Sequence, residues 1–127
     1  MTRDARQPEG LPVPGPPYSP VVVAGDLVYT AGQVAIDADG AIVPGGIAEQ
    51  TRQVLANLAR CLAAAGCGLD DVVKVTVFLA DLSDFEAFNE EYRRHLASPF
   101  PARSTVAVGL PAGLLVEIEA VARRAEP

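Results

Sequence analysis

The first half of the chain contains a hairpin pattern followed by a helical pattern. Two apolar runs within residues 21–36 flank Gly25-Asp26, residue types that tolerate unusual backbone angles, and therefore predict a β-hairpin. Residues 47–65 predict an amphipathic helix ending at Gly66, because their apolar positions fall on one helical face. Those positions are Ile47, Val54, Leu55, Leu58, Leu62 and Ala65.

The second half alternates strands with one more helix. Val72–Leu79 is a β-branched run of low polarity, typical of a strand that is covered on both faces. The capping-box pattern at residues 83–86 predicts a helix that runs to about Leu96. Its predicted buried residues are Phe85, Phe88, Tyr92 and Leu96. Strands are predicted at residues 104–108 and 114–122, joined by a loop rich in Gly and Pro.

This order of elements predicts a single α+β domain over residues 17–127. Short strands separated by two helices favour one mixed sheet with both helices packed on the same face. Residues 1–16 are rich in proline and are expected to form a flexible arm without regular structure. Half of the residues are hydrophobic and the mean hydropathy is +0.23, so the uncovered face of the sheet is expected to meet other copies of the chain.

Charge and composition argue against nucleic-acid binding, a membrane span and a metal site. The net charge is -6 and there is no basic run, which argues against nucleic-acid binding. No apolar segment is long enough to span a membrane, and the N-terminus lacks the apolar core of a secretion signal, so we expect a cytoplasmic protein. Cys61 and Cys67 are expected to be free thiols, and His95 a solvated residue near a helix end. We therefore expect no metal site.

Arg103 is the main candidate for chemistry. If the last two strands pair with each other, Arg103 and Thr105 face the same side as Glu117 and Glu119. A guanidinium can donate two parallel hydrogen bonds to a carboxylate, and a glutamate nearby can orient or deprotonate water. An ion pair between the two strands accounts for the same spacing, and structural ion pairs are commoner than active sites.

Four segments carry a family resemblance: Pro17-Tyr18-Ser19, Ala31-Gly32-Gln33, Pro101-Ala102-Arg103-Ser104 and Val116-Glu117-Ile118-Glu119-Ala120. In this order and spacing they resemble the Rid (YjgF) family, and the likeness extends from about residue 18 to residue 122. The resemblance implies a chorismate mutase-like domain that forms a homotrimer with a pocket at each subunit interface. It also implies hydrolysis of 2-imino acids, or their enamine tautomers, to 2-keto acids and ammonia without a cofactor or metal.

The resemblance also assigns roles to residues. It implies that Arg103 binds the substrate's carboxylate, that Glu117 positions water, that Tyr18 and Asn89 line the pocket, and that Gly32 lets backbone approach the ligand. Structural alternatives are an anchor for the arm at Tyr18, an ordinary polar helix position at Asn89 and a β-bulge at Gly32.

Two positions depart from the pattern of the best-studied deaminases, and both are expected to line the pocket. Ala31 stands where that pattern often has Ser, and Thr105 where it often has Cys. These changes alter pocket shape and hydrogen bonding, so they leave the identity of the substrate open.

Two other functions compete with that of a deaminase. One is a ligand-binding or chaperone-like trimer that has lost turnover, and the retention of both Arg103 and Glu117 argues against it. The other is the ribonuclease or translation-inhibitor activity often attached to the family, against which the acidic charge balance argues. Among deaminases, the natural imine and its pathway are open.

Overall fold

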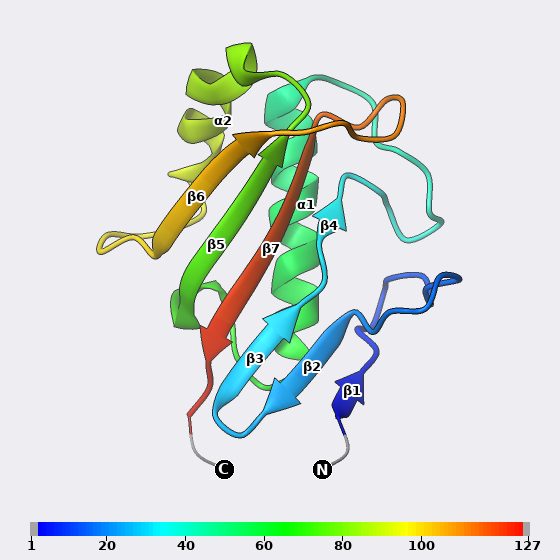
Figure 1. Ribbon diagram of the computed structural model, residues 1–127, viewed down its shortest axis with the longest axis vertical. Helices are drawn as coiled ribbons and strands as arrows, with labels where there is room; N and C mark the ends of the chain where they lie inside the picture. The colour runs from blue at the N-terminus through cyan, green and yellow to red at the C-terminus, as the bar shows by residue number, and fades with distance from the viewer. Residues whose placement is uncertain (1–2, 126–127) are drawn as a thin grey trace.

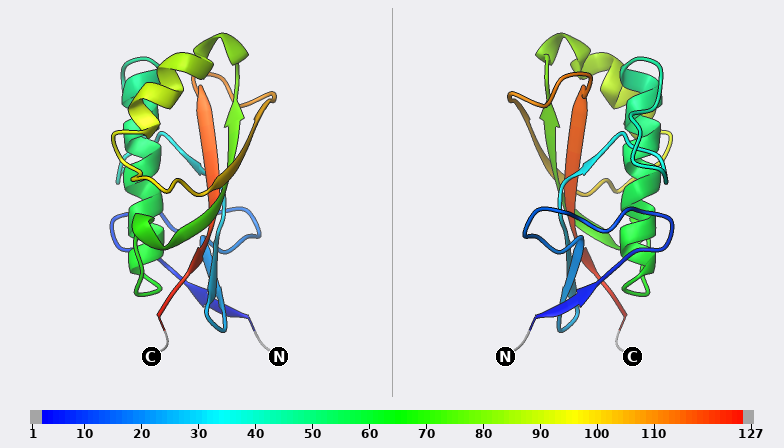
Figure 2. Two further views of the ribbon diagram at one scale, coloured as in Figure 1. Left: turned by 90° about the vertical axis from the view of Figure 1, so that its left-hand side faces the viewer. Right: turned by 90° about the vertical axis from the view of Figure 1, so that its right-hand side faces the viewer.

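The computed structural model describes residues 3–125, in which both helices pack on one side of a single sheet. Figure 1 looks through the sheet toward α1, and the side views in Figure 2 show the helices as one layer and the strands as the other. The helices are α1 (Ile47–Ala63) and α2 (Phe85–Tyr92), with short 3-10 turns η1 (Leu69–Asp71) and η2 (Leu82–Asp84). The strands are β1 (Asp4–Arg6), β2 (Val21–Ala24), β3 (Leu27–Thr30), β4 (Gln33–Val34), β5 (Val72–Leu79), β6 (Ala102–Ala107) and β7 (Val116–Arg123).

The sheet is mixed, and its strand order determines what can share a face. The order is β1-β2-β3-β7-β5-β6, and β4 pairs with β7. Strand β5 is parallel to β6 and antiparallel to β7, so α2 lies in the crossover between two parallel strands. The predicted α+β class, the mixed sheet and the placement of both helices on one face are confirmed.

The core lies between this helical layer and the sheet. Its largest fully buried side chains are Phe88, Leu55, Leu58, Leu62, Leu79 and Ile118. Each such leucine stabilises the fold by about 2 kcal/mol through removal of apolar surface from water. The predicted apolar face of α1 accounts for much of this core, which confirms the helical period seen in the sequence.

Two buried amides on α1 fix the segments that surround the candidate site. The Asn57 side chain donates hydrogen bonds to the carbonyls of Val34 (3.0 Å) and Ile36 (2.9 Å). The Gln50 side chain donates to the Gly113 carbonyl and accepts from the Leu115 amide, both at 2.8 Å. These bonds satisfy backbone groups at the ends of β4 and β7, and so hold both strands against the helix.

Several predicted boundaries were wrong. The N-terminal segment contains a strand, since β1 pairs antiparallel with β2 despite the prolines that follow it. The second hairpin strand is interrupted at Ala31 and Gly32, so β3 and β4 are separate. Helix α2 ends at Tyr92 rather than near Leu96.

The start of α2 also differs from the capping-box prediction. Asp81 caps η2, where its carboxylate accepts a hydrogen bond of 2.8 Å from the Ser83 amide. The 3-10 turn η2 occupies the expected first turn, and α2 itself has no side-chain cap. Phe85 is 40% exposed rather than buried, whereas Phe88 and Tyr92 lie in the core as predicted.

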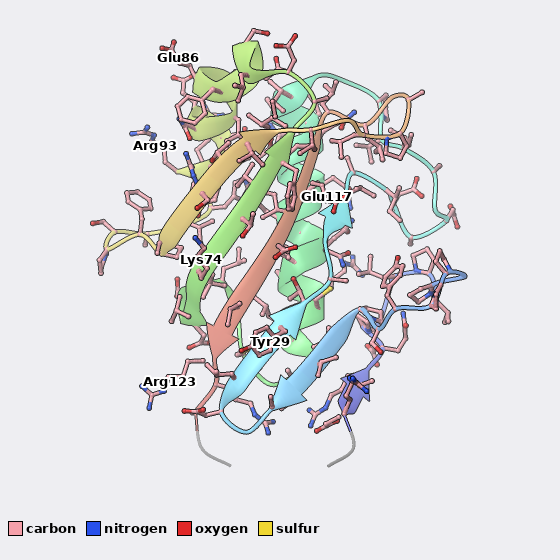
Figure 3. All side chains as sticks on the ribbon, viewed as in Figure 1. Tyr29, Lys74, Glu86, Arg93, Glu117 and Arg123 are labelled. Carbon is pink, nitrogen blue, oxygen red and sulfur yellow. The ribbon has the colours of Figure 1, made fainter. Side chains whose placement is uncertain are left out.

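Strand β5 is covered on one face only. Its residues Val75, Val77 and Leu79 are buried under the helices, while Thr76 and Phe78 on the other face are half-buried. Tyr29 and Val106 lie on that second face and are each 44% exposed. We call the face away from the helices the open face; Figure 3 shows it toward the viewer, with Tyr29, Lys74 and Glu117 labelled.

Both thiols are free. Cys61 is buried in the core, where burial raises its pKa to about 12, and Cys67 is half-buried. A thiol with so high a pKa is a poor nucleophile, so Cys61 has a packing role. Between residues 3 and 125, neither helix has the length and apolar character required to cross a bilayer.

Candidate functional site

The strand register places the predicted residues on two faces of the sheet. Arg103 and Thr105 pair with Val75 and Val77, whose side chains point toward the helices. Glu117 and Glu119 instead pair with Phe78 and Thr76, which point to the open face. Paired residues share a face, so the expectation that the arginine and the two glutamates face one side is wrong. It assumed that the last two strands are neighbours, whereas β5 lies between them.

Helix α2 holds Arg103 in place. Arg103 Nη2 donates a hydrogen bond of 2.7 Å to Asn89 Oδ1. The guanidinium carbon lies 5.7 Å, 5.4 Å and 5.0 Å from the ring centroids of Phe85, Phe88 and Tyr92. These ring faces attract the cation and limit its rotation, so the guanidinium is oriented before any ligand arrives.

A cavity of about 280 Å³ opens beside this guanidinium. Its lining residues are Asn89, Tyr92, Arg93, Phe100, Pro101 and Arg103. No carboxylate in residues 3–125 forms an ion pair with Arg103, because its protein partners are a neutral amide and aromatic rings. An unneutralised guanidinium at a cavity wall is suited to bind an anionic group from outside the chain.

Two hydroxyls near Arg103 are buried without a hydrogen-bond partner among residues 3–125. They are Thr105 Oγ1, two residues along β6, and Tyr92 Oη, whose ring faces the guanidinium. Burial raises the pKa of Tyr92, which keeps its hydroxyl protonated at neutral pH. A buried hydroxyl without a partner costs free energy, so these two atoms are unusual features of the helical side.

Glu117 lies on the open face against Gly32. A Cβ atom on Gly32 would overlap the Glu117 carboxylate and would lie 2.8 Å from its Cδ. Glycine at residue 32 therefore leaves the space that Glu117 occupies. Burial, with the negative charge of Glu119 as a second cause, raises the pKa of Glu117. A carboxylate with a raised pKa is a better proton acceptor near neutral pH than an ordinary glutamate.

Tyr18 and Gly32 line a smaller cavity of about 60 Å³. The other lining residues are Leu11, Pro12, Pro14, Pro20, Gln33, Val34 and Ile36. Ala31 joins this segment to the residue that precedes β2, because its amide donates to the Pro20 carbonyl at 2.8 Å. Tyr18 is 53% exposed, so its side chain is accessible.

The predicted residues thus form two groups within one chain. The helical side holds Arg103, Asn89 and Thr105, and the open face holds Glu117 against Gly32. Gly32 shares its cavity with Tyr18, and Ala31 precedes it in the chain. Sequence reasoning missed that Phe85, Phe88 and Tyr92 surround the arginine. Their signal was present, because residues 85, 88, 89 and 92 are spaced to share one face of a helix.

His95 is less solvated than expected. It is 28% exposed by side chain and lies 2.7 Å from Glu91, a buried carboxylate that also pairs with Arg52 (3.3 Å) and Arg94 (3.2 Å). The hydrogen bond with His95 is the main cause that lowers the pKa of Glu91. This cluster joins the C-terminal part of α2 to α1.

Known proteins match this chain over most of its length. The family model described as endoribonuclease L-PSP matches residues 10–124. A protein from Yersinia pestis, described as a member of the conserved Rid protein family, superposes with a TM-score of 0.90 and 37% identity, covering 96% of this chain and 99% of the other. The chain belongs to the Rid family.

Two further Rid-family relatives carry more specific descriptions. A protein from Capra hircus named 2-iminobutanoate/2-iminopropanoate deaminase is 47% identical over 108 residues, which are 84% of this chain and 79% of that protein. The crystal structure of TdcF from E. coli, with bound serine, is 35% identical at a TM-score of 0.88, covering 96% and 99% of the two chains. These matches confirm the family expected from the sequence motifs.

Proposed function

We propose that this protein is a hydrolytic deaminase that converts 2-imino acids, or their enamine tautomers, to 2-keto acids and ammonia. Two side chains together carry the proposal. The Arg103 guanidinium has no acidic partner within residues 3–125, and the Glu117 carboxylate has a raised pKa. The relative named 2-iminobutanoate/2-iminopropanoate deaminase supports this choice of reaction. The relative with bound serine supports a ligand that carries a carboxylate and a nitrogen on one carbon.

The active site in this proposal is formed by two copies of the chain within a homotrimer. Arg103 and Glu117 lie on opposite faces of one sheet, so a ligand held by one side chain cannot reach the other in the same copy. A neighbouring copy packed on the open face supplies the missing half. The exposed apolar side chains of Tyr29 and Val106 on that face support burial against a partner.

In the proposed reaction, the substrate's carboxylate binds the free edge of the Arg103 guanidinium. Asn89 and the three aromatic rings fix the plane of that edge, so the imine carbon is held in one place. Glu117 of the neighbouring copy accepts a proton from water as the water oxygen bonds to the imine carbon. The C=N π electrons move to nitrogen, which takes up a proton.

The resulting amino alcohol then releases ammonia. The C–N bond breaks, its electron pair leaves with the nitrogen, and the hydroxyl proton is lost as the C=O bond forms. A protonated imine is already electrophilic, so this route needs only orientation and one proton acceptor. No side-chain nucleophile takes part, and the proposal needs no cofactor.

The test uses imine generated in situ from an amino acid by an amino acid oxidase, with release of the keto acid followed over time. We expect the parent protein to accelerate release, and Glu117→Gln to lower kcat by about 100-fold or more, the usual contribution of a general base. Keto-acid affinity should change little in this variant, because Arg103 is intact.

Two results would overturn the proposal. The first is a parent protein that binds keto acid without accelerating hydrolysis, which would instead support a ligand-binding trimer. The second is a Glu117→Gln variant as fast as the parent. Sedimentation equilibrium tests the assembly separately, and about three times the chain mass of 13.2 kDa is expected.

A further inference from the structure

A second arginine lines the cavity beside Arg103. Arg93 lies at the C-terminal end of α2 and lines the same cavity of about 280 Å³. Figure 3 shows Arg93 projecting from the end of α2, well separated from Glu86 near the start of that helix. No role in the hydrolysis proposed above needs this second positive charge, because one guanidinium suffices to bind one carboxylate.

Neither guanidinium has an acidic partner within residues 3–125. Arg93 makes only a long hydrogen bond of 3.4 Å from Nε to the Asn89 carbonyl. Its neighbour Arg94 instead turns to Glu91 at 3.2 Å. Glu86 and Glu90 line an adjoining depression together with Arg93, yet neither forms an ion pair with it.

Two like charges that line one cavity repel each other, although Arg93 is exposed and water screens part of this repulsion. Tyr92, Phe100 and Pro101 add apolar surface to the cavity wall. A ligand with a single carboxylate neutralises one guanidinium and leaves the other unpaired. A ligand with two negative groups removes the repulsion and pairs both cations.

The size of the cavity limits the ligand to a small molecule. Its volume is close to the lower end of ligand pockets, which begin at about 300 Å³. Both arginines line the cavity together with Asn89, so two negative groups of one short molecule can reach both cations.

We propose that Arg93 is a specificity-determining residue that binds a second acidic group, so that the preferred substrates are imines of dicarboxylic amino acids. Arg103 binds the carboxylate next to the imine, and Arg93 binds the carboxylate at the other end of the substrate. This inference rests on the proposed deaminase function, and it adds the class of substrate.

The test compares two keto acids of the same chain length that differ in the second carboxylate. Binding of 2-oxoglutarate and 2-oxopentanoate is measured by calorimetry on the intact protein. We expect the parent to bind 2-oxoglutarate about tenfold more tightly, the effect of one charged hydrogen-bonded pair. Arg93→Gln should remove most of that preference, and Arg93→Lys should keep part of it, because lysine retains the charge without the planar fork.

Arg94→Gln is the matched control. It removes the same charge from the adjacent residue, whose side chain turns to Glu91 and not to the cavity. We expect this variant to keep the preference for 2-oxoglutarate. A preference that falls equally in Arg93→Gln and Arg94→Gln would show a general field effect and would overturn the assignment, as would a parent that binds both keto acids equally.

A parallel turnover assay separates this inference from the deaminase proposal. Imines are generated from L-glutamate and from L-norvaline by suitable oxidases, and keto-acid release is followed. We expect faster hydrolysis of the glutamate imine at low substrate concentration. Hydrolysis of both imines at equal rates would overturn the role of Arg93 alone, whereas hydrolysis of neither would overturn the deaminase function.

Discussion

Arg103 and Glu117 lie on opposite faces of the sheet and are held in position in different ways. On the helical side, Arg103 is held by a hydrogen bond of 2.7 Å from its Nη2 to Asn89 and by three aromatic rings. On the open side, Glu117 has no hydrogen-bond partner among residues 3–125, and its position is set by the space that Gly32 leaves. One residue is fixed by attraction and the other by available space.

This difference indicates how a site can be divided between copies. Arg103 is ready to bind a carboxylate in a single chain, because its supporting contacts come from α2 of the same copy. Glu117 lies half-buried on the open face. In the proposed site these two residues come from neighbouring copies of the chain, and the predictions below test each half.

The largest expected effect is at Arg103. Arg103→Ala should lower kcat/KM for imine hydrolysis by about 30-fold to a few thousand-fold, since loss of a charged hydrogen-bonding partner typically costs about 2 to 5 kcal/mol. Arg103→Lys should recover only part, because an ammonium lacks the planar fork. Sedimentation of both variants checks that assembly is retained. Undiminished turnover by Arg103→Ala would return this residue to a structural role.

The next prediction tests the division of the site directly. Arg103→Ala and Glu117→Gln trimers are each expected to be nearly inactive. When they are mixed and unfolded and refolded together, about one quarter of the interfaces should combine an intact Arg103 with an intact Glu117, and about that share of parental activity should return. Complementation that stays at the background of the two variants would show that one chain contains the whole site.

A smaller effect concerns the acid limb of the pH profile. Burial, and then the charge of Glu119, raises the pKa of Glu117, so activity that needs the deprotonated carboxylate should rise at a higher pH than for an ordinary glutamate. Glu119→Gln removes the like charge, and the limb should move to lower pH. High salt should move the parent limb in the same direction and the variant limb less. A limb that does not move in Glu119→Gln would contradict this electrostatic link.

Sequence alone predicted the regular parts of the fold well. The β2–β3 hairpin followed from its turn residues, α1 from its apolar period, and the bounds of β5 from a β-branched run, although β5 is covered on one face only in this chain. The Rid-family motifs predicted the class of the fold, which the comparisons confirm. Strand β1 was missed because its three residues precede a proline-rich segment and carry no apolar alternation.

The relation between Arg103 and Glu117 was not predictable from local pattern. Two strands joined by a short loop resemble a hairpin, yet the loop passes over β5 and the two strands never pair. The order of β5, α2 and β6 along the chain indicated a different pairing, since two strands joined through a helix are commonly parallel neighbours. Placing β6 beside β5 would have put the arginine and the glutamate on opposite faces.

The smallest predicted effect is at Thr105, where stability and activity should change in opposite directions. Thr105→Val keeps the side-chain shape and removes a buried hydroxyl that has no hydrogen-bond partner within residues 3–125. Removing such a group should leave the free energy of unfolding unchanged or raise it by about 1 kcal/mol, measured by denaturant titration. Turnover should fall only mildly, within about tenfold, because a neutral hydrogen bond from this hydroxyl to a bound ligand contributes about 0.5 to 1.5 kcal/mol. A loss of stability in the variant would mean that Thr105 Oγ1 has a partner in the assembled protein. A covalent adduct trapped on Thr105 in the parent would contradict a mechanism in which water is the nucleophile.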